Sequence, residues 1–219
     1  MLEFIEVETA PNPTVAVIWL HGLGADGSDF VPIVNEIDLR GCPPIRFIFP
    51  HAPTMPVTVN NGYVMPAWYD ILGADLTRRE DALGLQKSQA AIEELIAAQN
   101  ALGIPSERIL LAGFSQGCAM TLQVGLRHPR KLAGLLCLSG YLPLATMLDA
   151  ERSPANQATP IFMGHGRSDP VVVMARAATS LALLQKAGYV VEWHDDPMQH
   201  AVCPHEIDDI GAWMRRILG

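Results

Sequence analysis

Short apolar runs alternate with longer stretches of helical periodicity along most of the chain. Residues 15–20 are continuously apolar, and residues 108–112 are apolar after a single Arg. Such runs are typical of strands that are covered on both faces of a parallel sheet. Residues 2–7 instead alternate apolar and acidic side chains, which predicts a half-buried edge strand. Shorter apolar runs, each predicted to be a strand, lie at residues 45–49, 135–138, 161–163 and 190–193.

Apolar residues recur at helical spacing between these runs. Ser28 and Asp29 are the expected caps of the first helix, and Thr77 with Glu80 resembles a capping box for the second. Pro204 stands at a first-turn position and opens the last helix. The predicted helices cover residues 30–37, 78–102, 118–128, 171–187 and 204–217.

The least regular stretch is residues 51–76, which is rich in Pro and holds an Asn-Asn-Gly turn pattern at residues 60–62. Its apolar and aromatic content favours an ordered loop packed near a pocket. The alternation of strands and helices elsewhere predicts the α/β class, with a mostly parallel central sheet and helices on both faces. Since the sequence shows no repeat, low-complexity segment or linker, we predict one domain over residues 1–219.

Composition narrows the classes of function. The 219 residues are 49% hydrophobic and 17% charged, which suits a domain with a sizeable core. A net charge of −8 argues against a nucleic-acid surface and against binding to anionic membranes. The four Cys lack metal-ligand spacing, so we expect buried free thiols and no metal. We find no signal-peptide pattern and no bilayer-spanning apolar run, so we expect a reduced, cytoplasmic setting.

A candidate nucleophile lies in the turn after residues 108–112. Residues 113–117 read Gly-Phe-Ser-Gln-Gly and match the Gly-x-Ser-x-Gly nucleophile elbow, between a predicted strand and a predicted helix. Such a turn strains the Ser backbone and crowds its neighbours, so the residues two before and two after it must be nearly free of side chain. The following helix directs its N-terminal N–H groups toward the nucleophile. This context favours Ser115 as a nucleophile over an ordinary flexible loop.

A base for Ser115 must follow it in the sequence, because the order in such hydrolases is Ser, acid, His. His165, His194, His200 and His205 all follow. His200 lies in a loop after the last predicted strand, and ligands of parallel sheets bind at the carboxyl ends of strands. His194 lies at or in a strand, and His205, the main rival, lies in the first turn of a helix. We therefore expect His200 to be the base.

Asp169 is the expected acid, which should orient the base and stabilise its charged form. It lies just past a predicted strand, after Gly and Ser residues. Asp195 and Asp196 are close to His200 in sequence, but a solvated turn explains them better. Asp149 is a further candidate for the acid.

Two backbone N–H groups are expected to stabilise the oxyanion. One belongs to Gln116, directly after the nucleophile, and the other to Leu23 in a Gly-rich loop after an early strand. The same loop matches the dinucleotide pattern Gly-x-Gly-x-x-Gly at Gly22, Gly24 and Gly27. A ribose-binding acid about 20 residues further on lacks the required strand end, so we expect no cofactor.

Six stretches spread over nearly the whole chain form a specific combined pattern. They are residues 20–26, 49–53, 65–70, 111–117, 164–166 with Asp169, and 207–213. In these stretches the chain resembles the bacterial carboxylesterases that are related to acyl-protein thioesterases and lysophospholipases. The resemblance implies an α/β-hydrolase fold and a catalytic triad that falls on Ser115, Asp169 and His200.

The resemblance also implies a short acyl-chain groove. Its lining would be Leu23, Trp68, Ile71, Leu72 and Val171, for which plain core packing is the alternative. Members of this family are often dimers, so a homodimer is expected.

Some positions depart from the family pattern. Gln199 stands where Gly usually precedes the catalytic His, and Cys118 replaces a frequent Gly. Cys203 and His205 occupy positions where polar or acidic residues are common. These departures bear on chain-length preference and redox sensitivity, and they remove no member of the triad.

We therefore expect a carboxylesterase, a serine hydrolase that cleaves small-molecule esters of small or medium acyl chains through an acyl-enzyme. The alternative is an acyl-protein thioesterase or lysophospholipase with the same triad, because ester and thioester hydrolysis use one machinery. A catalytically silent binding protein is the alternative from another class.

Overall fold

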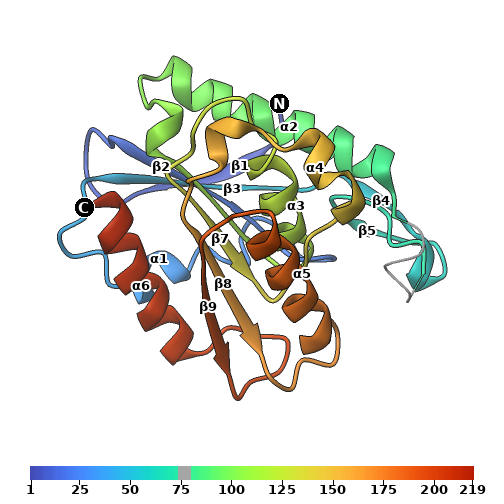
Figure 1. The fold of residues 1–219 in the computed structure, drawn as a ribbon. Coiled ribbons are helices and arrows are strands. Elements are labelled where there is room, and N and C mark those ends of the chain that lie inside the picture. Colours follow the sequence, from blue (N-terminus) through green and yellow to red (C-terminus); the bar gives the residue numbers. More distant parts are fainter. Residues whose placement is uncertain (74–79) are drawn as a thin grey trace.

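A computed structural model describes residues 1–73 and 80–219, and a seven-stranded sheet in the order β1-β3-β2-β6-β7-β8-β9 forms its centre (Figure 1). β1 pairs antiparallel with β3, and the other neighbouring strands of this sheet pair in parallel. The strands are β1 (Phe4–Glu8), β2 (Val15–Leu20), β3 (Ile45–Pro50), β6 (Ile109–Phe114), β7 (Gly134–Leu138), β8 (Ile161–Gly166) and β9 (Val191–Asp196). The predicted α/β class and mostly parallel sheet are confirmed.

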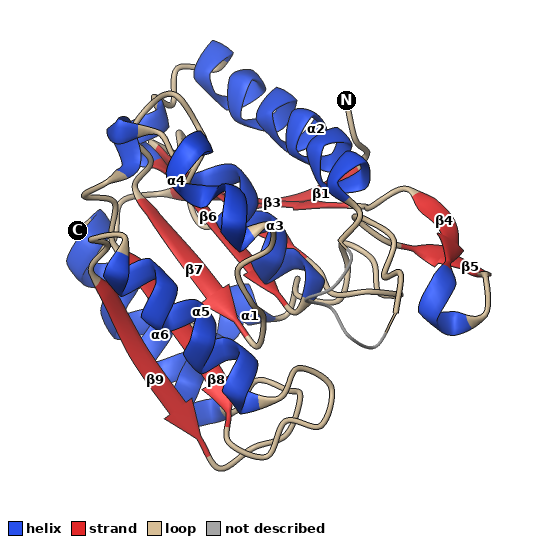
Figure 2. Ribbon diagram, turned by 45° about the vertical axis from the view of Figure 1, so that its right-hand side comes forward, coloured by secondary structure: helices blue, strands red, loops and turns tan. Residues whose placement is uncertain are grey.

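Helices cover both faces of the sheet. The helices are α1 (Ile33–Glu36), α2 (Ala82–Ala101), α3 (Gln116–Gly125), α4 (Leu148–Glu151), α5 (Met174–Lys186) and α6 (Pro204–Leu218), with short 3₁₀ turns at Thr58–Asn60, Ser106–Arg108, Ala145–Met147 and Pro154–Asn156. α2, α3 and α5 lie on one face, and α1 and α6 lie on the other (Figures 1 and 2). None of the helices in the described part of the chain combines the length and apolarity needed to cross a bilayer.

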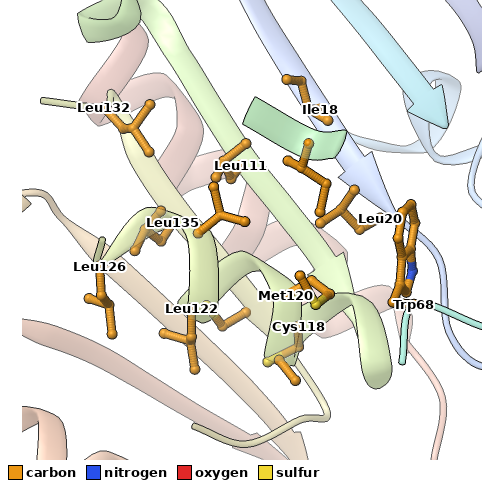
Figure 3. Close-up of a cluster of buried hydrophobic side chains, with 14 of the residues drawn as sticks. Ile18, Leu20, Trp68, Leu111, Cys118, Met120, Leu122, Leu126, Leu132 and Leu135 are labelled. Atoms are coloured by element: carbon orange, nitrogen blue, oxygen red, sulfur yellow. The ribbon is translucent and has the colours of Figure 1, made fainter. Parts of the chain in front are cut away.

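Two apolar layers explain why β6 is a continuous apolar run. Leu111 joins the core cluster under α3, while Leu110 and Ala112 join the cluster under α6. Figure 3 shows the first cluster, in which Leu111 and Leu135 of the sheet lie near side chains of α3. Successive strand residues point to opposite faces, so a strand with both faces covered needs apolar residues at every position.

The first predicted helix is wrong over half of its length, because only α1 is helical within residues 30–37. Ser28 donates to the Oδ1 atom of Asp26 from its backbone N–H at 2.7 Å and from its hydroxyl at 2.6 Å. These bonds hold the backbone in a turn and compete with a helix start. The residue at the N-terminal cap of α1 is Pro32, with no side-chain capping bond, so Ser28 and Asp29 are not caps.

The start of the second predicted helix also differs. Thr77 lies outside the described residues, as does the first part of the predicted range. α2 begins after Asp81, whose side chain accepts from the Gly84 N–H at 2.9 Å. Glu80 accepts from the Leu144 N–H at 3.0 Å and therefore serves a distant loop.

The irregular stretch contains a two-stranded antiparallel ribbon that the sequence analysis missed, β4 (Thr54–Val57) and β5 (Tyr63–Pro66). It stands apart from the main sheet (Figure 2). Prolines argue against a central strand but are tolerated on edge strands, and both strands of a two-stranded ribbon are edges. The predicted turn at residues 60–62 joins them, with Asn61 in the left-handed region at φ 56°.

Candidate active site

Ser115 lies at the sharp turn between β6 and α3, with φ 55° and ψ −114°. A Cβ atom on Gly113 would lie 2.2 Å from the Gly117 carbonyl oxygen, and one on Gly117 would lie 2.1 Å from the Leu20 carbonyl oxygen. Only glycine fits at either position, because these contacts are with backbone atoms. The steric reason for the Gly-x-Ser-x-Gly pattern is therefore present in the fold.

Asp169 and His200 are hydrogen-bonded, with 2.6 Å between the carboxylate Oδ2 and the imidazole Nδ1. The other carboxylate oxygen, Oδ1, accepts from the N–H groups of Val171 and Val172 at 2.8 and 2.9 Å. The Asp169 side chain is fully buried. An ionised carboxylate only accepts, so this contact requires the proton on Nδ1 and leaves Nε2 of a neutral imidazole free to accept.

Ser115 and His200 line the same cavity of about 480 Å³. The ring of His200 packs against the ring of Phe114, the residue before the serine, with 4.8 Å between ring centroids. The imidazole therefore lies over the strand end that carries Ser115. The three residues that the sequence analysis selected as a triad come together at the carboxyl ends of β6, β8 and β9.

The rival histidines His205 and His194 have other partners. His205 is hydrogen-bonded through Nδ1 to Asp196 at 2.9 Å, and its side chain is 73% exposed. His194 lies within β9 and contacts Glu192 at 3.0 Å and Asp209 at 2.8 Å. Neither His205 nor His194 is among the described residues that line the cavity of Ser115.

His165 is also held away from the role of base. Its Nε2 atom lies 2.7 Å from the carbonyl oxygen of Val172, and burial lowers the pKa of this histidine because its charged form would lose water. Among the acids, Asp195 and Asp196 belong to β9, so a solvated turn is the wrong description of them. Asp195 accepts from the guanidinium of Arg167.

The Gly-rich loop after β2 lies against the nucleophile. A Cβ atom on Gly22 would lie 3.4 Å from the Ser115 Cβ, and both Leu23 and Gln116 line the cavity. The side chain of Gln116 is buried in the wall, where Oε1 accepts from the Trp68 N–H at 2.8 Å and Nε2 donates to the Tyr69 carbonyl at 2.7 Å. Both polar atoms of the Gln116 side chain are therefore already bonded, and its backbone N–H is the group left to serve a bound substrate.

The predicted acyl groove agrees only in part with the cavity. Leu23, Ile71 and Val171 line it, but Trp68 and Leu72 are not among its described lining residues. Trp68 is fully buried, and its indole Nε1–H donates to the His21 carbonyl at 2.9 Å. The resemblance covered the whole loop around the Trp-Tyr-Asp stretch. It therefore did not separate residues that line the cavity, such as Ile71, from buried residues that support it, such as Trp68.

The sequence analysis missed several residues of the cavity wall. Tyr69 and Tyr141 share a hydrogen bond between their hydroxyls at 2.8 Å, 72 positions apart in sequence, and both line the cavity. Asp29 also lines it, and Val59 and Asn60 reach it from the turn between β4 and β5. The missed ribbon explains the last two, and only the Trp-Tyr-Asp stretch offered a signal for Tyr69.

The cysteines are free, but their expected burial is only half right. Cys118 and Cys137 are buried, while Cys42 and Cys203 are partly exposed. Burial, and then the neighbouring thiol of Cys118, raise the pKa of Cys137 well above its usual value.

Comparisons with known proteins agree with this geometry. A family model described as Phospholipase/Carboxylesterase matches residues 3–218. The acyl-protein thioesterase 1 of Gibberella zeae is 42% identical over 218 residues, which is 95% of this chain and 93% of that protein. The acyl-protein thioesterase 1 of Schizosaccharomyces pombe is 44% identical over 177 residues, which is 79% of this chain and 78% of that protein.

Solved structures show the same fold. SOBER1 of Arabidopsis thaliana has a TM-score of 0.88 at 29% identity and covers 94% of this chain and 99% of its own. The acyl-protein thioesterase 2 of Zea mays has a TM-score of 0.84 at 27% identity and covers 98% of this chain and 99% of its own. Both curated relatives are fungal, so the narrower likeness to bacterial carboxylesterases is not supported. The chain is a hydrolase with the α/β-hydrolase fold, and it belongs to the phospholipase/carboxylesterase family.

Proposed function

We propose that this chain hydrolyses acyl thioesters, as an acyl-protein thioesterase, through an acyl-enzyme on Ser115. The observation that carries the proposal is the Asp169–His200 hydrogen bond of 2.6 Å at the cavity that Ser115 lines. The thioester preference is supported by the relatives, which are named acyl-protein thioesterases and are 42% and 44% identical to this chain.

His200 is the base in this mechanism. Its Nδ1–H is held by Asp169, so Nε2 takes the proton of the Ser115 hydroxyl as the oxygen attacks the acyl carbonyl. The imidazolium then gives this proton to the departing thiolate or alkoxide. Water repeats the cycle on the acyl-enzyme, which releases the carboxylic acid and frees the serine.

The N–H groups of Leu23 and Gln116 stabilise the oxyanion of both tetrahedral intermediates. Both residues line the same cavity as Ser115. Each donor of this kind contributes about 100-fold to 1,000-fold in kcat. The acyl chain lies along Ile71 and Val171, which form an apolar part of the same cavity.

Carboxylesterase activity on small-molecule esters is the second candidate function. It is favoured by the description of the matching family and by a nucleophile that does not distinguish an ester from a thioester.

A cytoplasmic setting, a homodimer and the lack of a nucleic-acid partner remain expectations from the sequence. Light scattering on the purified protein tests the homodimer.

Matched substrates separate the two candidates. The experiment compares kcat/KM for an S-octanoyl cysteine peptide, the O-octanoyl serine peptide of the same sequence and octanoyl lysophosphatidylcholine, with Ser115→Ala as the control. We expect Ser115→Ala to hydrolyse none of the three substrates. For the wild type, we expect the S-octanoyl peptide to have the highest kcat/KM. A faster O-acyl peptide would favour the carboxylesterase, and turnover that persists in Ser115→Ala would exclude the proposed nucleophile.

A further inference from the structure

His21 is buried directly after β2, at the start of the loop that contains Leu23. The residue is 1% exposed, and its ring packs against the indole of Trp68 with 5.3 Å between centroids. Each ring nitrogen has one backbone partner. Nδ1 lies 2.7 Å from the Gly22 carbonyl oxygen, and Nε2 lies 3.0 Å from the backbone nitrogen of Ala52.

These two partners determine the tautomer of His21. A backbone N–H only donates, so Nε2 must offer its lone pair to Ala52. A carbonyl oxygen only accepts, so Nδ1 must carry the proton that binds Gly22. Both bonds exist together only in the neutral Nδ1–H form. Burial lowers the pKa of His21 below its usual value, because the imidazolium would lose its water, and this favours the same neutral form.

The bond to Gly22 fixes the direction of a whole peptide unit. The Gly22 carbonyl and the Leu23 N–H belong to the same planar trans peptide, so they point in opposite directions. The carbonyl is held from the buried side by the His21 ring and also accepts from the Ala25 N–H at 3.3 Å. Gly22 and Leu23 both line the cavity.

We propose that His21 is a positioning residue that turns the Leu23 N–H toward the oxyanion by holding the Gly22 carbonyl. The inference rests on the proposed function, in which that N–H is one of two donors. His21 itself touches no substrate in this role. Its ring acts only through the Gly22–Leu23 peptide.

Trp68 connects this loop to the second proposed donor. Its indole N–H donates to the His21 carbonyl at 2.9 Å, and its backbone N–H donates to the Gln116 side chain at 2.8 Å. The residue after the nucleophile and the oxyanion loop are therefore both hydrogen-bonded to one buried residue, Trp68. This arrangement keeps the two N–H groups at a fixed separation, which preorganised electrostatic stabilisation requires.

Two amide substitutions separate the two bonds of the His21 ring. In His21→Asn the side-chain NH₂ takes the place of Nδ1 and can still donate to Gly22. In His21→Gln the side-chain oxygen takes the place of Nε2 and can still accept from Ala52, but the side-chain donor to Gly22 is lost and only the longer bond from the Ala25 N–H remains. We expect kcat of His21→Gln on an acyl thioester to fall about 100-fold with KM nearly unchanged, as for the loss of one oxyanion donor.

His21→Asn is the rescue variant, and we expect it to recover at least about tenfold of that loss in kcat. Equal losses in kcat for both variants, or a loss confined to KM, would overturn the positioning role. Wild-type turnover that Ser115→Ala abolishes establishes the proposed function separately. If the wild type shows no such turnover, the proposed function fails, and the inference fails with it.

A measurement on the wild-type protein does not depend on either variant folding. Long-range proton–nitrogen NMR correlations distinguish the two neutral tautomers of a histidine ring. We expect His21 to show a protonated Nδ1 and an unprotonated Nε2 at neutral pH. A protonated Nε2 would leave the Gly22 carbonyl without the His21 donor and would overturn the inference.

Discussion

The Nδ1 atom of His200 lies 2.6 Å from the Oδ2 atom of Asp169, although 31 positions separate the two residues in the sequence. The fold brings them together because each follows one of two adjacent parallel strands, β8 and β9. The carboxyl ends of parallel strands meet at one edge of a sheet. Asp169 is further fixed by two backbone N–H groups, so the direction of each carboxylate oxygen is determined.

Asp169→Asn tests this arrangement. The N–H groups of Val171 and Val172 both point at the Oδ1 position, so they select the amide oxygen there. The amide NH₂ must then face His200, which moves the imidazole proton to Nε2 and removes the base. We expect kcat to fall about 10,000-fold, as when the acid of another serine hydrolase triad is replaced in this way.

The control for Asp169→Asn is its thermal midpoint, which we expect to stay close to that of the wild type because the two backbone bonds are kept. A kcat within tenfold of the wild type, measured on a nitrophenyl ester, would contradict the role of the Asp169–His200 pair.

Gly117→Ala tests the packing of the elbow. The added Cβ would lie 2.1 Å from the Leu20 carbonyl oxygen, so the start of α3 must move away from β2. We expect the free energy of unfolding to drop by about 3 kcal/mol, as for overpacking in a rigid core. Gly73→Ala is the matched control, since no described atom lies within 4 Å of its added Cβ. Urea denaturation measures both, and equal midpoints would contradict the steric argument.

Steric and topological rules made the elbow and the triad predictable from sequence. Gly113 and Gly117 are required wherever a serine sits in such a turn, and Asp169 and His200 lie in the loops that follow β8 and β9, two segments predicted to be strands. These features depend on a few neighbouring residues. The prediction of these features is therefore unaffected by small errors in the predicted ends of each strand.

The parts that the sequence did not predict depend on contacts between distant segments. The role of Trp68 comes from its partners His21 and Gln116, about which its own neighbours carry no information. Likewise the β4–β5 ribbon tolerates proline only because it has two edges, so local rules excluded it. The missed ribbon also hid Val59 as a residue of the cavity.

Gln116→Met tests the link between the elbow and Trp68. The substitution leaves the Trp68 N–H and the Tyr69 carbonyl buried without partners, while the backbone N–H at position 116 is kept. Each unpaired buried group costs about 1–3 kcal/mol, so we expect the free energy of unfolding to fall by about 2–4 kcal/mol. Urea denaturation checks this. A change below about 0.5 kcal/mol, which is that of a neutral surface substitution, would mean that the two bonds are not formed.

Glu206 lies in the first turn of α6 and is completely buried. Its carboxyl group lies against Gly164 of β8, and neither carboxyl oxygen has a hydrogen-bond partner among the described residues. Burial, and then the negative charges of Asp196 and Asp209, raise the pKa of Glu206 from 4.5 to about 8. The folded protein therefore holds a proton on Glu206 at neutral pH.

This proton makes stability depend on pH in a definite direction. Between pH 4.5 and about 8 the native state keeps the proton of Glu206 and the unfolded chain has released it, so stability falls as pH rises. The slope from this group approaches about 1.4 kcal/mol per pH unit. The side chain of Glu206→Gln cannot ionise. We therefore expect the free energy of unfolding, measured in urea at pH 5, 6.5 and 8, to decrease less between pH 5 and 8 for Glu206→Gln than for the wild type. Parallel curves for the two proteins would show that Glu206 has the same pKa folded and unfolded.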